Sequence, residues 1–419
     1  MVPHDTPILI RGGTLIDGSG EDSRIRSSVL VEGERITRIT SERGMALGKG
    51  WRVIDAEGHT VLPGLIDAHV HFFGSRSPDP MMWAIEPEPL NCARAVFDAW
   101  KLLDYGFTTV RDVGSRNGVA LKRATEEATI IGPRIVPAHL GLSQTCGHGD
   151  VHSLPSHWLA GQSVMAHIVD GVDNVRAAVR SSIRDGADLV KVWATGGTMS
   201  ERDSLEDQHY SMEELRVIVE EAHRFRRKVA SHAEGLLGAR ASISAGVDSI
   251  EHGFVLDEEA CAKMKAQGVF LVPTLVLLER VVNTPGVPEF AKQKGRPMFK
   301  AHLESFKLAV AMGVRIGAGS DAFSDPVTPF GPYNIRELQL MVNAGLTPLE
   351  AIQTATANNA ELLGLDDQLG TLEEGKLADI LVVEGDLTQD IAPLMDRANL
   401  LAVLKGGRQM PRLGDVWPG

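Results

Sequence analysis

Several short apolar segments of this chain end in side chains that can bind a metal ion or move a proton. The first is Asp67–His71, in which His69 and His71 stand two positions apart. Side chains two apart on a strand point the same way, so both imidazoles would face one centre, with Asp67 behind them to orient a ligand. The candidates at later segment ends are Lys191, His232, His252 and Asp321. Converging histidines and carboxylates are typical of a divalent metal site.

The middle of the chain alternates short apolar runs with helical patterns, and these elements must bring the candidates together. Such alternation is typical of parallel strands joined by crossover helices. The expected strands are Leu65–His71, Thr108–Val113, Arg134–Leu140, Asp188–Thr195, Lys228–Ala233, Ser249–Gly253, Val269–Leu275 and Val314–Asp321. Eight units over roughly 300 residues favour a (β/α)8 TIM barrel, whose active site lies at the carboxyl ends of the strands. A doubly wound open sheet is the alternative.

Both ends of the chain have a different sequence pattern, in which β-branched residues alternate with polar ones between turn-forming glycines, as is typical of β-strands. Chain termini often lie close together, so we expect the two ends to form one small β-sandwich domain. The predicted division is residues 1–62 plus 365–419 for this composite domain and residues 63–364 for the catalytic barrel. Residues 143–171 show little regular pattern and are expected to form a long loop, which is a common place for a lid.

Composition excludes several classes of protein. The 419 residues carry 42 Lys and Arg against 55 Asp and Glu, a formal net charge of −13, and no basic stripe that a nucleic acid would need. No apolar stretch is long enough to span a bilayer, and the first ten residues do not resemble a signal peptide, although a trimmed chain would start the same way. The scattered cysteines Cys92, Cys146 and Cys261 indicate a reducing, cytoplasmic location. No GxSxG motif points to a serine hydrolase.

The pattern of HxH, lysine, two histidines and aspartate on successive strands resembles the amidohydrolase superfamily. The phrases PGLIDAHVH, GFTTVRD, SQTCGHGD, IEHG and GKLADILVVEGD resemble its binuclear branch. That branch includes Xaa-Pro dipeptidases (prolidases), Xaa-Arg/Lys carboxypeptidases and ochratoxin-degrading amidohydrolases. Its members usually read SQTGGH, so Cys146 in SQTCGH is a departure that bears on the shape of this loop.

The resemblance implies two divalent metal ions, with zinc as the expected metal. One ion would be held by His69, His71 and Asp321, and the other by His232 and His252. Burial lowers the pKa of a lysine amine, and a neutral amine can add CO₂. The resemblance implies that Lys191 forms such a carbamate and bridges both ions. A water between the ions would lose its proton and attack the amide, with Asp321 as the proton shuttle to the leaving amine.

The resemblance also indicates residues on the substrate side. His148 would contact the reacting carbonyl, and Tyr210 would stabilise the developing oxyanion. His139, at the end of the third strand, is a further candidate for substrate binding. Arg202 and Arg76 lie in loops after the fourth and first strands, where a guanidinium could pair with a substrate carboxylate.

These residues together predict a metal-dependent hydrolase that cleaves an amide bond to a C-terminal amino acid in a small dipeptide or N-acyl amino acid. An aryl amide such as ochratoxin A, or a cyclic amide or imidazolone, is the alternative substrate. A non-catalytic assembly protein of the same fold is a remote alternative, disfavoured by the intact ligand set. Relatives commonly form homo-oligomers, so the resemblance implies a homo-oligomer here, with no nucleic acid and no membrane as partner.

Overall fold

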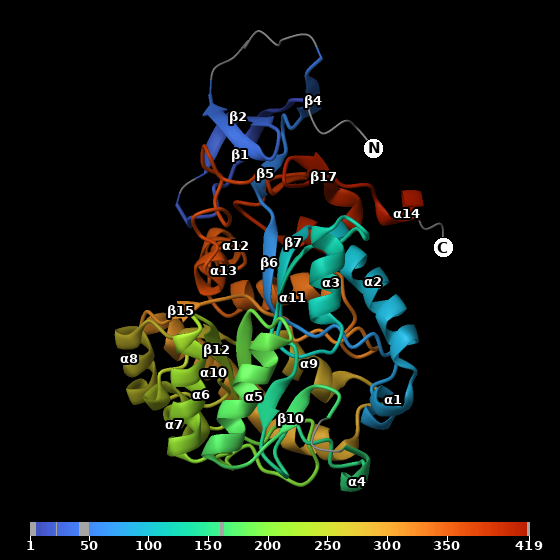
Figure 1. Cartoon of the computed structure of the whole chain (residues 1–419). Helices are drawn as coiled ribbons and strands as arrows, with labels where there is room; N and C mark the ends of the chain where they lie inside the picture. Colours follow the sequence, from blue (N-terminus) through green and yellow to red (C-terminus); the bar gives the residue numbers. More distant parts are fainter. Residues whose placement is uncertain (1–5, 22, 42–49, 160–162, 417–419) are drawn as a thin grey trace.

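The computed structural model describes residues 6–21, 23–41, 50–159 and 163–416, and these form a mixed α/β fold (Figure 1). Strands from the two ends of the chain gather at one end of the molecule, and strands and helices from the middle of the chain form the rest. None of the described helices is both long enough and apolar enough to cross a lipid bilayer.

One eight-stranded sheet contains strands from both chain ends. Its members are β1 (Ile8–Leu15), β2 (Arg24–Glu32), β3 (Arg35–Thr40), β4 (Arg52–Asp55), β5 (Thr60–Pro63), β16 (Ile380–Val383), β17 (Leu400–Lys405) and β18 (Arg408–Gln409). The order is β18-β17-β16-β5-β1-β2-β3, and β4 pairs with β1. Ile36 on β3 donates its N–H to the carbonyl of Lys376 (3.0 Å), so the far edge of the sheet meets the segment just before β16. An apolar core lies inside this curled sheet.

The central strands form two parallel sheets. A three-stranded sheet has the order β6-β7-β8, from β6 (Leu65–Val70), β7 (Phe107–Asp112) and β8 (Arg134–Pro137). A seven-stranded sheet has the order β10-β9-β11-β12-β13-β14-β15, from β9 (Gly141–Ser143), β10 (Ala166–Ile168), β11 (Leu189–Trp193), β12 (Lys228–Ala233), β13 (Ser249–His252), β14 (Phe270–Val272) and β15 (Arg315–Ile316).

Backbone hydrogen bonds connect the two parallel sheets on both sides. Ala68 on β6 donates to the carbonyl of Ala318 (2.9 Å), and His71 donates to that of Ala322 (2.9 Å), just after β15. On the other side Asp188 donates to the carbonyl of Pro137 at the end of β8 (2.8 Å). The first and last central strands therefore lie side by side, and residues far apart in the sequence can meet at their ends.

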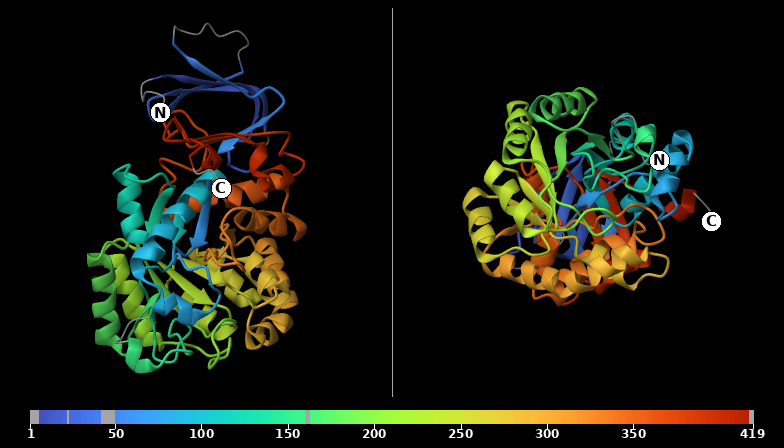
Figure 2. Two further views of the ribbon diagram at one scale, coloured as in Figure 1. Left: turned by 90° about the vertical axis from the view of Figure 1, so that its right-hand side faces the viewer. Right: turned by 90° about the horizontal axis from the view of Figure 1, so that it is seen from below.

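Helices lie on the outside of the central strands, as the view from below in Figure 2 shows. They are α1 (Pro80–Ile85), α2 (Glu88–Asp104), α3 (Gly118–Glu126), α4 (Ser156–Leu159), α5 (Val172–Arg184), α6 (Met212–Arg224), α7 (Leu236–Ala245), α8 (Glu258–Gln267), α9 (Leu275–Asn283), α10 (Glu289–Ala311), α11 (Pro332–Asn343), α12 (Pro348–Thr354), α13 (Ala357–Leu363) and α14 (Leu413–Val416). Ser211 and Glu214 form a capping box at the start of α6, where they exchange hydrogen bonds.

Two stretches differ from the strands and loops expected from the sequence. The expected third strand stops at Pro137, because His139 has a φ of 58°, which no strand residue adopts, and the chain resumes as β9. The expected long loop 143–171 contains α4 and β10, and within it residues 160–162 lie outside the described part of the chain.

Candidate metal centre and active site

Three of the predicted metal ligands meet where β6 and the segment after β15 run side by side. His69 lies on β6, His71 directly follows β6, and Asp321 follows β15. The Nε2 atoms of both histidines face Oδ1 of Asp321, at 3.3 Å from His69 and 3.2 Å from His71. The backbone fixes this approach, because Asp321 donates its N–H to the carbonyl of His69 (2.8 Å).

Hydrogen bonds at Nδ1 orient three of the predicted histidine ligands. The pairs are His69 with Oε2 of Glu251 (2.8 Å), His71 with the carbonyl of Gly114 (2.8 Å) and His252 with Oγ1 of Thr274 (2.7 Å). An Nδ1–H that donates leaves Nε2 of a neutral ring with a free lone pair. The carboxylate of Glu251 and the carbonyl of Gly114 only accept, so they leave Nε2 of His69 and of His71 available to a metal ion, whereas the hydroxyl of Thr274 can donate to His252 or accept from it.

His69 is supported by a buried ion pair that was not predicted from the sequence. Arg111 on β7 donates through Nη2 to both carboxylate oxygens of Glu251 on β13 (2.7 and 2.8 Å), and both side chains are buried. Burial alone would raise the pKa of Glu251, but Arg111 and His69 hold it below the usual range, so Glu251 stays ionised. The sequence did contain a signal for this pair, because Arg111 and Glu251 are charged residues within otherwise apolar strands.

Asp67 holds the backbone near the predicted ligands through hydrogen bonds of its carboxylate. Its carboxylate accepts hydrogen bonds from the N–H of His69 (2.9 Å), the hydroxyl of Ser320 (2.7 Å) and the amide of Asn334 (2.8 Å). These contacts connect β6 with the segment that carries Asp321. Burial raises the pKa of Asp67.

Lys191 on β11 and His232 on β12 complete the predicted ligand set. Burial lowers the pKa of Lys191 to about 8, although the carboxylates of Glu251 and Asp321 favour its charged form. The ligand atoms fall into two groups, each within 4.8 Å, and these are His69, His252 and Asp321, and His148, His232 and Glu234. His252 therefore lies with His69 and Asp321 as well as beside His232, whose ring centroid is 4.6 Å away.

The donor set fits divalent ions. Burial lowers the pKa of His71, His232 and His252, so their rings are neutral ligands at neutral pH. Oδ1 of Asp321 is buried and makes no well-formed hydrogen bond to any residue that the structure describes, although two imidazole nitrogens face it. A cation among these atoms would satisfy a buried carboxylate oxygen that is otherwise left without a partner.

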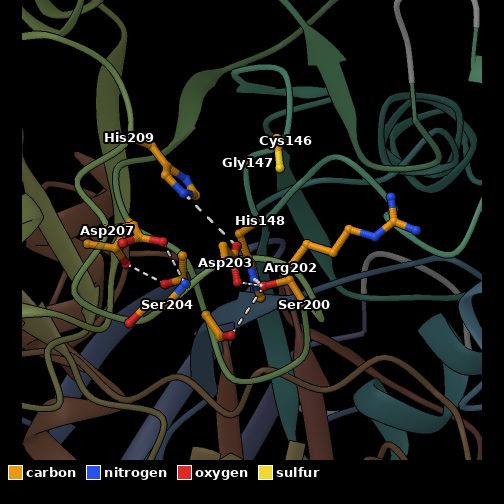
Figure 3. A network of polar contacts seen from close by, with 12 residues as sticks. Cys146, Gly147, His148, Ser200, Arg202, Asp203, Ser204, Asp207 and His209 are labelled. Atoms are coloured by element: carbon orange, nitrogen blue, oxygen red, sulfur yellow. Dashed lines mark hydrogen bonds and ion pairs between the residues drawn. The ribbon is translucent and has the colours of Figure 1, made fainter. Parts of the chain in front are cut away.

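His148 lies in the same pocket, against the ring of His232. The two rings are stacked with centroids 4.5 Å apart. Nδ1 of His148 lies 2.7 Å from Oγ of Ser200, as Figure 3 shows, and burial lowers the pKa of His148 to about 4. Cys146, two residues earlier, is exposed and has a φ of 62°, a conformation that suits the glycine usual in the related motif.

The other predicted substrate-side residues do not line the pocket. The buried hydroxyl of Tyr210 donates to the carbonyl of Val169 (3.2 Å). His139 packs near His167, with ring centroids 6.5 Å apart. Arg76 donates to both carboxylate oxygens of Asp98 (3.0 and 2.8 Å), and the exposed side chain of Arg202 extends away from the network in Figure 3.

The pocket above the candidate ligands is about 250 Å³ and has a mainly apolar outer wall. That wall includes Trp83, Met199, Leu277, Val281, Val287, Phe290, Phe323 and Val327. Lys191 is the only lysine or arginine side chain among the described lining residues. The pocket lining also includes polar residues outside the predicted ligands, among them Asp150, His152 and Glu201.

The chain belongs to the amidohydrolase family, which its residues 60–410 match. Ochratoxinase from Aspergillus niger is 34% identical over 423 residues, covering 96% of this chain and 86% of that protein. The crystal structure of A. niger ochratoxinase superposes with a TM-score of 0.87 at 33% identity, covering 96% of this chain and 95% of that one.

Solved dipeptidases are similar to the same extent. A Xaa-Pro dipeptidase with bound methionine in its active site has a TM-score of 0.87 at 33% identity, covering 97% of this chain and all of that one. A prolidase complexed with N-methylphosphonate-L-proline has a TM-score of 0.88 at 33% identity and the same coverage. The protein is thus an amidohydrolase-type enzyme, consistent with a hydrolase acting on C–N bonds.

Proposed function

We propose that this chain cleaves an amide bond between an apolar acyl group and a C-terminal amino acid, as in an N-acyl amino acid or a dipeptide. One observation carries this proposal: five predicted ligands and a buried lysine lie together beneath a largely apolar pocket. The related ochratoxinase and Xaa-Pro dipeptidase support an amide substrate.

The proposed site holds two divalent ions, with zinc favoured by the imidazole and carboxylate donors. His69, His71, His232, His252 and Asp321 would be the ligands, with Lys191 as a carbamate shared by both ions. A buried amine with a pKa of about 8 is partly neutral at pH 7, as carbamate formation requires. Bound ions of this kind supply Lewis acidity toward a carbonyl and lower the pKa of water.

Asp321 is the residue proposed to move the proton. Its Oδ1 lies at the centre of the ligand cluster, where the attacking water and the scissile bond must meet. Nearby histidines hold the pKa of Asp321 below its usual range despite burial, so the carboxylate is ionised, which is the form that can accept a proton. It then gives that proton to the nitrogen of the leaving amine.

The proposal also covers the domain organisation and the assembly of the protein. We infer that the two parallel sheets form one closed (β/α)8 barrel of residues 63–364, because hydrogen bonds connect them on both sides. Residues 1–62 and 365–419 would form the composite β-sandwich domain. A homo-oligomer is the proposed assembly, on the resemblance to relatives alone.

Substrate class is the part that an experiment must decide. The zinc-loaded enzyme is assayed against N-acyl amino acids, dipeptides, aryl amides including ochratoxin A, and cyclic amides. We expect the highest kcat/KM on N-acyl amino acids with an apolar acyl group. A higher kcat/KM on cyclic amides, or on aryl amides without an amino acid, would replace this proposal with the alternative substrate. No turnover of any amide would refute both.

A further inference from the structure

The helix that follows β14 begins with backbone N–H groups that a carboxylate from a distant part of the chain satisfies. The first N–H groups of a helix have no partner within that helix, and the start of α9 is buried. Glu337 on α11 accepts from the N–H of Leu275 (2.9 Å) and from that of Val276 (2.8 Å), one with each carboxylate oxygen. The proposed reaction does not use this buried carboxylate.

Thr274 is the N-cap residue of α9, but its hydroxyl does not cap the helix. A threonine at this position usually accepts a hydrogen bond from an N–H of the first turn through its Oγ1. Here Oγ1 of Thr274 lies 2.7 Å from Nδ1 of His252, a predicted metal ligand. Because Glu337 caps the helix instead, the hydroxyl of Thr274 is left for the imidazole.

The backbone of Thr274 is strained in this arrangement. Its φ of 51° and ψ of 45° are left-handed, which is a rare conformation for a β-branched residue. Such a conformation persists where the contacts around it impose it. A second contact between the same two helices, the ion pair of Arg336 on α11 with Glu279 on α9 (2.7 and 3.1 Å), also holds α9 against α11. The side chains of α11 therefore determine where α9 begins.

We propose that Glu337 is a positioning residue of the metal centre, which caps α9 in place of Thr274 and so keeps the hydroxyl of Thr274 at His252. This inference rests on the proposed function, since it takes His252 as a zinc ligand. The partner at Nδ1 fixes the orientation of the ring, and the loss of such a partner weakens metal binding. Without Glu337, two buried N–H groups would be unpaired, and the hydroxyl of Thr274 would turn back to accept from one of them, as an N-cap side chain does.

The first test measures zinc affinity without turnover, by competition with a chromophoric chelator. Glu337→Ala and Thr274→Val should each weaken zinc binding about tenfold, the effect of losing a hydrogen-bond partner of a ligand. Thr274→Ser keeps the hydroxyl and should bind zinc as the wild type does. Because Glu337 acts through Thr274, a double variant that combines Glu337→Ala with Thr274→Val should bind zinc no more weakly than Thr274→Val alone.

Glu350→Ala is the matched control and should leave zinc affinity unchanged. Glu350 also accepts hydrogen bonds at the start of a helix, from the N–H and the hydroxyl of Thr347, but it is exposed, and no described residue of α12 lines the pocket. A thermal melt confirms that each variant is folded, and Glu337→Gln, which keeps one acceptor oxygen, replaces a Glu337→Ala that does not fold. The proposal is overturned if the Glu337 or Thr274→Val variant binds zinc as the wild type does, or if their effects multiply to about a hundredfold.

The second test is a crystal structure of the Glu337 variant. We expect Oγ1 of Thr274 to accept from the N–H of Val276 or Leu277 and to leave Nδ1 of His252. An unchanged contact between Thr274 and His252 would overturn the positioning role. If zinc affinity falls as expected but the zinc-loaded wild-type enzyme cleaves no amide, the proposed function fails while the positioning role holds. If amides are cleaved but the variants keep wild-type zinc affinity, the positioning role fails and the proposed function holds.

Discussion

Lys191 is the residue whose protonation most directly controls the proposed centre. It is buried, and burial lowers its pKa to about 8, so the fraction of neutral amine rises as the pH passes from 7 to 9. CO₂ adds only to the neutral amine. We therefore expect zinc and bicarbonate to reactivate metal-depleted enzyme faster at pH 9 than at pH 7. Activity recovered after each incubation, assayed at one common pH, is the measurement.

Lys191→Ala tests the same residue by removal. The variant should lose at least nine-tenths of kcat and much of its metal content, and a short carboxylic acid such as propionate should partly restore both. Metal analysis of the purified protein provides a readout that is separate from turnover. Native-like metal content and rate in this variant would exclude Lys191 as a ligand.

Glu251 supports a ligand and also compensates a buried charge. Glu251→Ala removes the partner of Nδ1 of His69 and leaves the buried guanidinium of Arg111 without its carboxylate. Breaking a buried pair in this way costs about 3–5 kcal/mol. We expect a loss of that order in the unfolding free energy, measured by denaturant titration, together with weaker zinc binding.

Glu127→Ala is the comparison for that substitution. Glu127 is exposed and pairs with Arg123 on the helix surface. Exposed pairs at this spacing contribute about 0.3–0.5 kcal/mol, so this variant should be nearly as stable as the wild type. An equal loss of unfolding free energy in the two variants would mean that the buried pair stabilises the fold no more than the exposed one does.

At the scale of elements, the loop after β11 sets the position of His148. Gly197→Ala would place a methyl group 2.3 Å from the ring of His148, so the ring or the loop must move. We expect kcat/KM to fall at least tenfold while zinc content stays at the wild-type level, because the predicted ligands lie on other segments. Metal analysis and steady-state kinetics measure the two effects.

Gly414→Ala is a suitable control, since a Cβ there meets no atom within 4 Å. It should leave both kinetics and metal content unchanged. A folded Gly197→Ala enzyme with wild-type kcat/KM would show that the reaction does not depend on the position of the His148 ring.

The elements also show what the sequence alone could predict. His69, Lys191, His232 and His252 could be recognised in the sequence because each is a polar residue within or at the end of a short apolar run. The close approach of Gly196 to Asp203 and of Gly197 to His148 could not be predicted from the sequence, because it depends on contacts that form only in the folded chain.

The partners of Arg76 and Arg202 could not be predicted from the sequence either, because they too depend on contacts between separate elements. Arg76 and Arg202 lie in loops after strands, but a loop position does not determine which carboxylate a guanidinium meets. Arg76 forms an ion pair with Asp98 on α2, while Arg202 is exposed. Ion pairs of this kind form between elements distant in the sequence, and local pattern carries no information about them.

At the scale of the whole molecule, β16 joins the two halves of the terminal sheet. It pairs with β5 on one side and β17 on the other. A chain that stops before Ile380 would leave β5 with an unpaired apolar edge, which favours aggregation. We expect this truncation to sediment as aggregates, whereas a chain ending at Met410, which lacks only α14 and the last residues, should behave as the full chain does.

The pairing of β5 with β16 also constrains when the protein can fold during synthesis. The N-terminal strands leave the ribosome first, yet their partner follows more than 300 residues later. At roughly 5–20 residues per second, the edge of β5 waits on the order of tens of seconds or longer for its neighbour. The nascent chain therefore carries an unprotected strand through most of translation, and holding chaperones should bind this protein mainly at its first sixty or so residues.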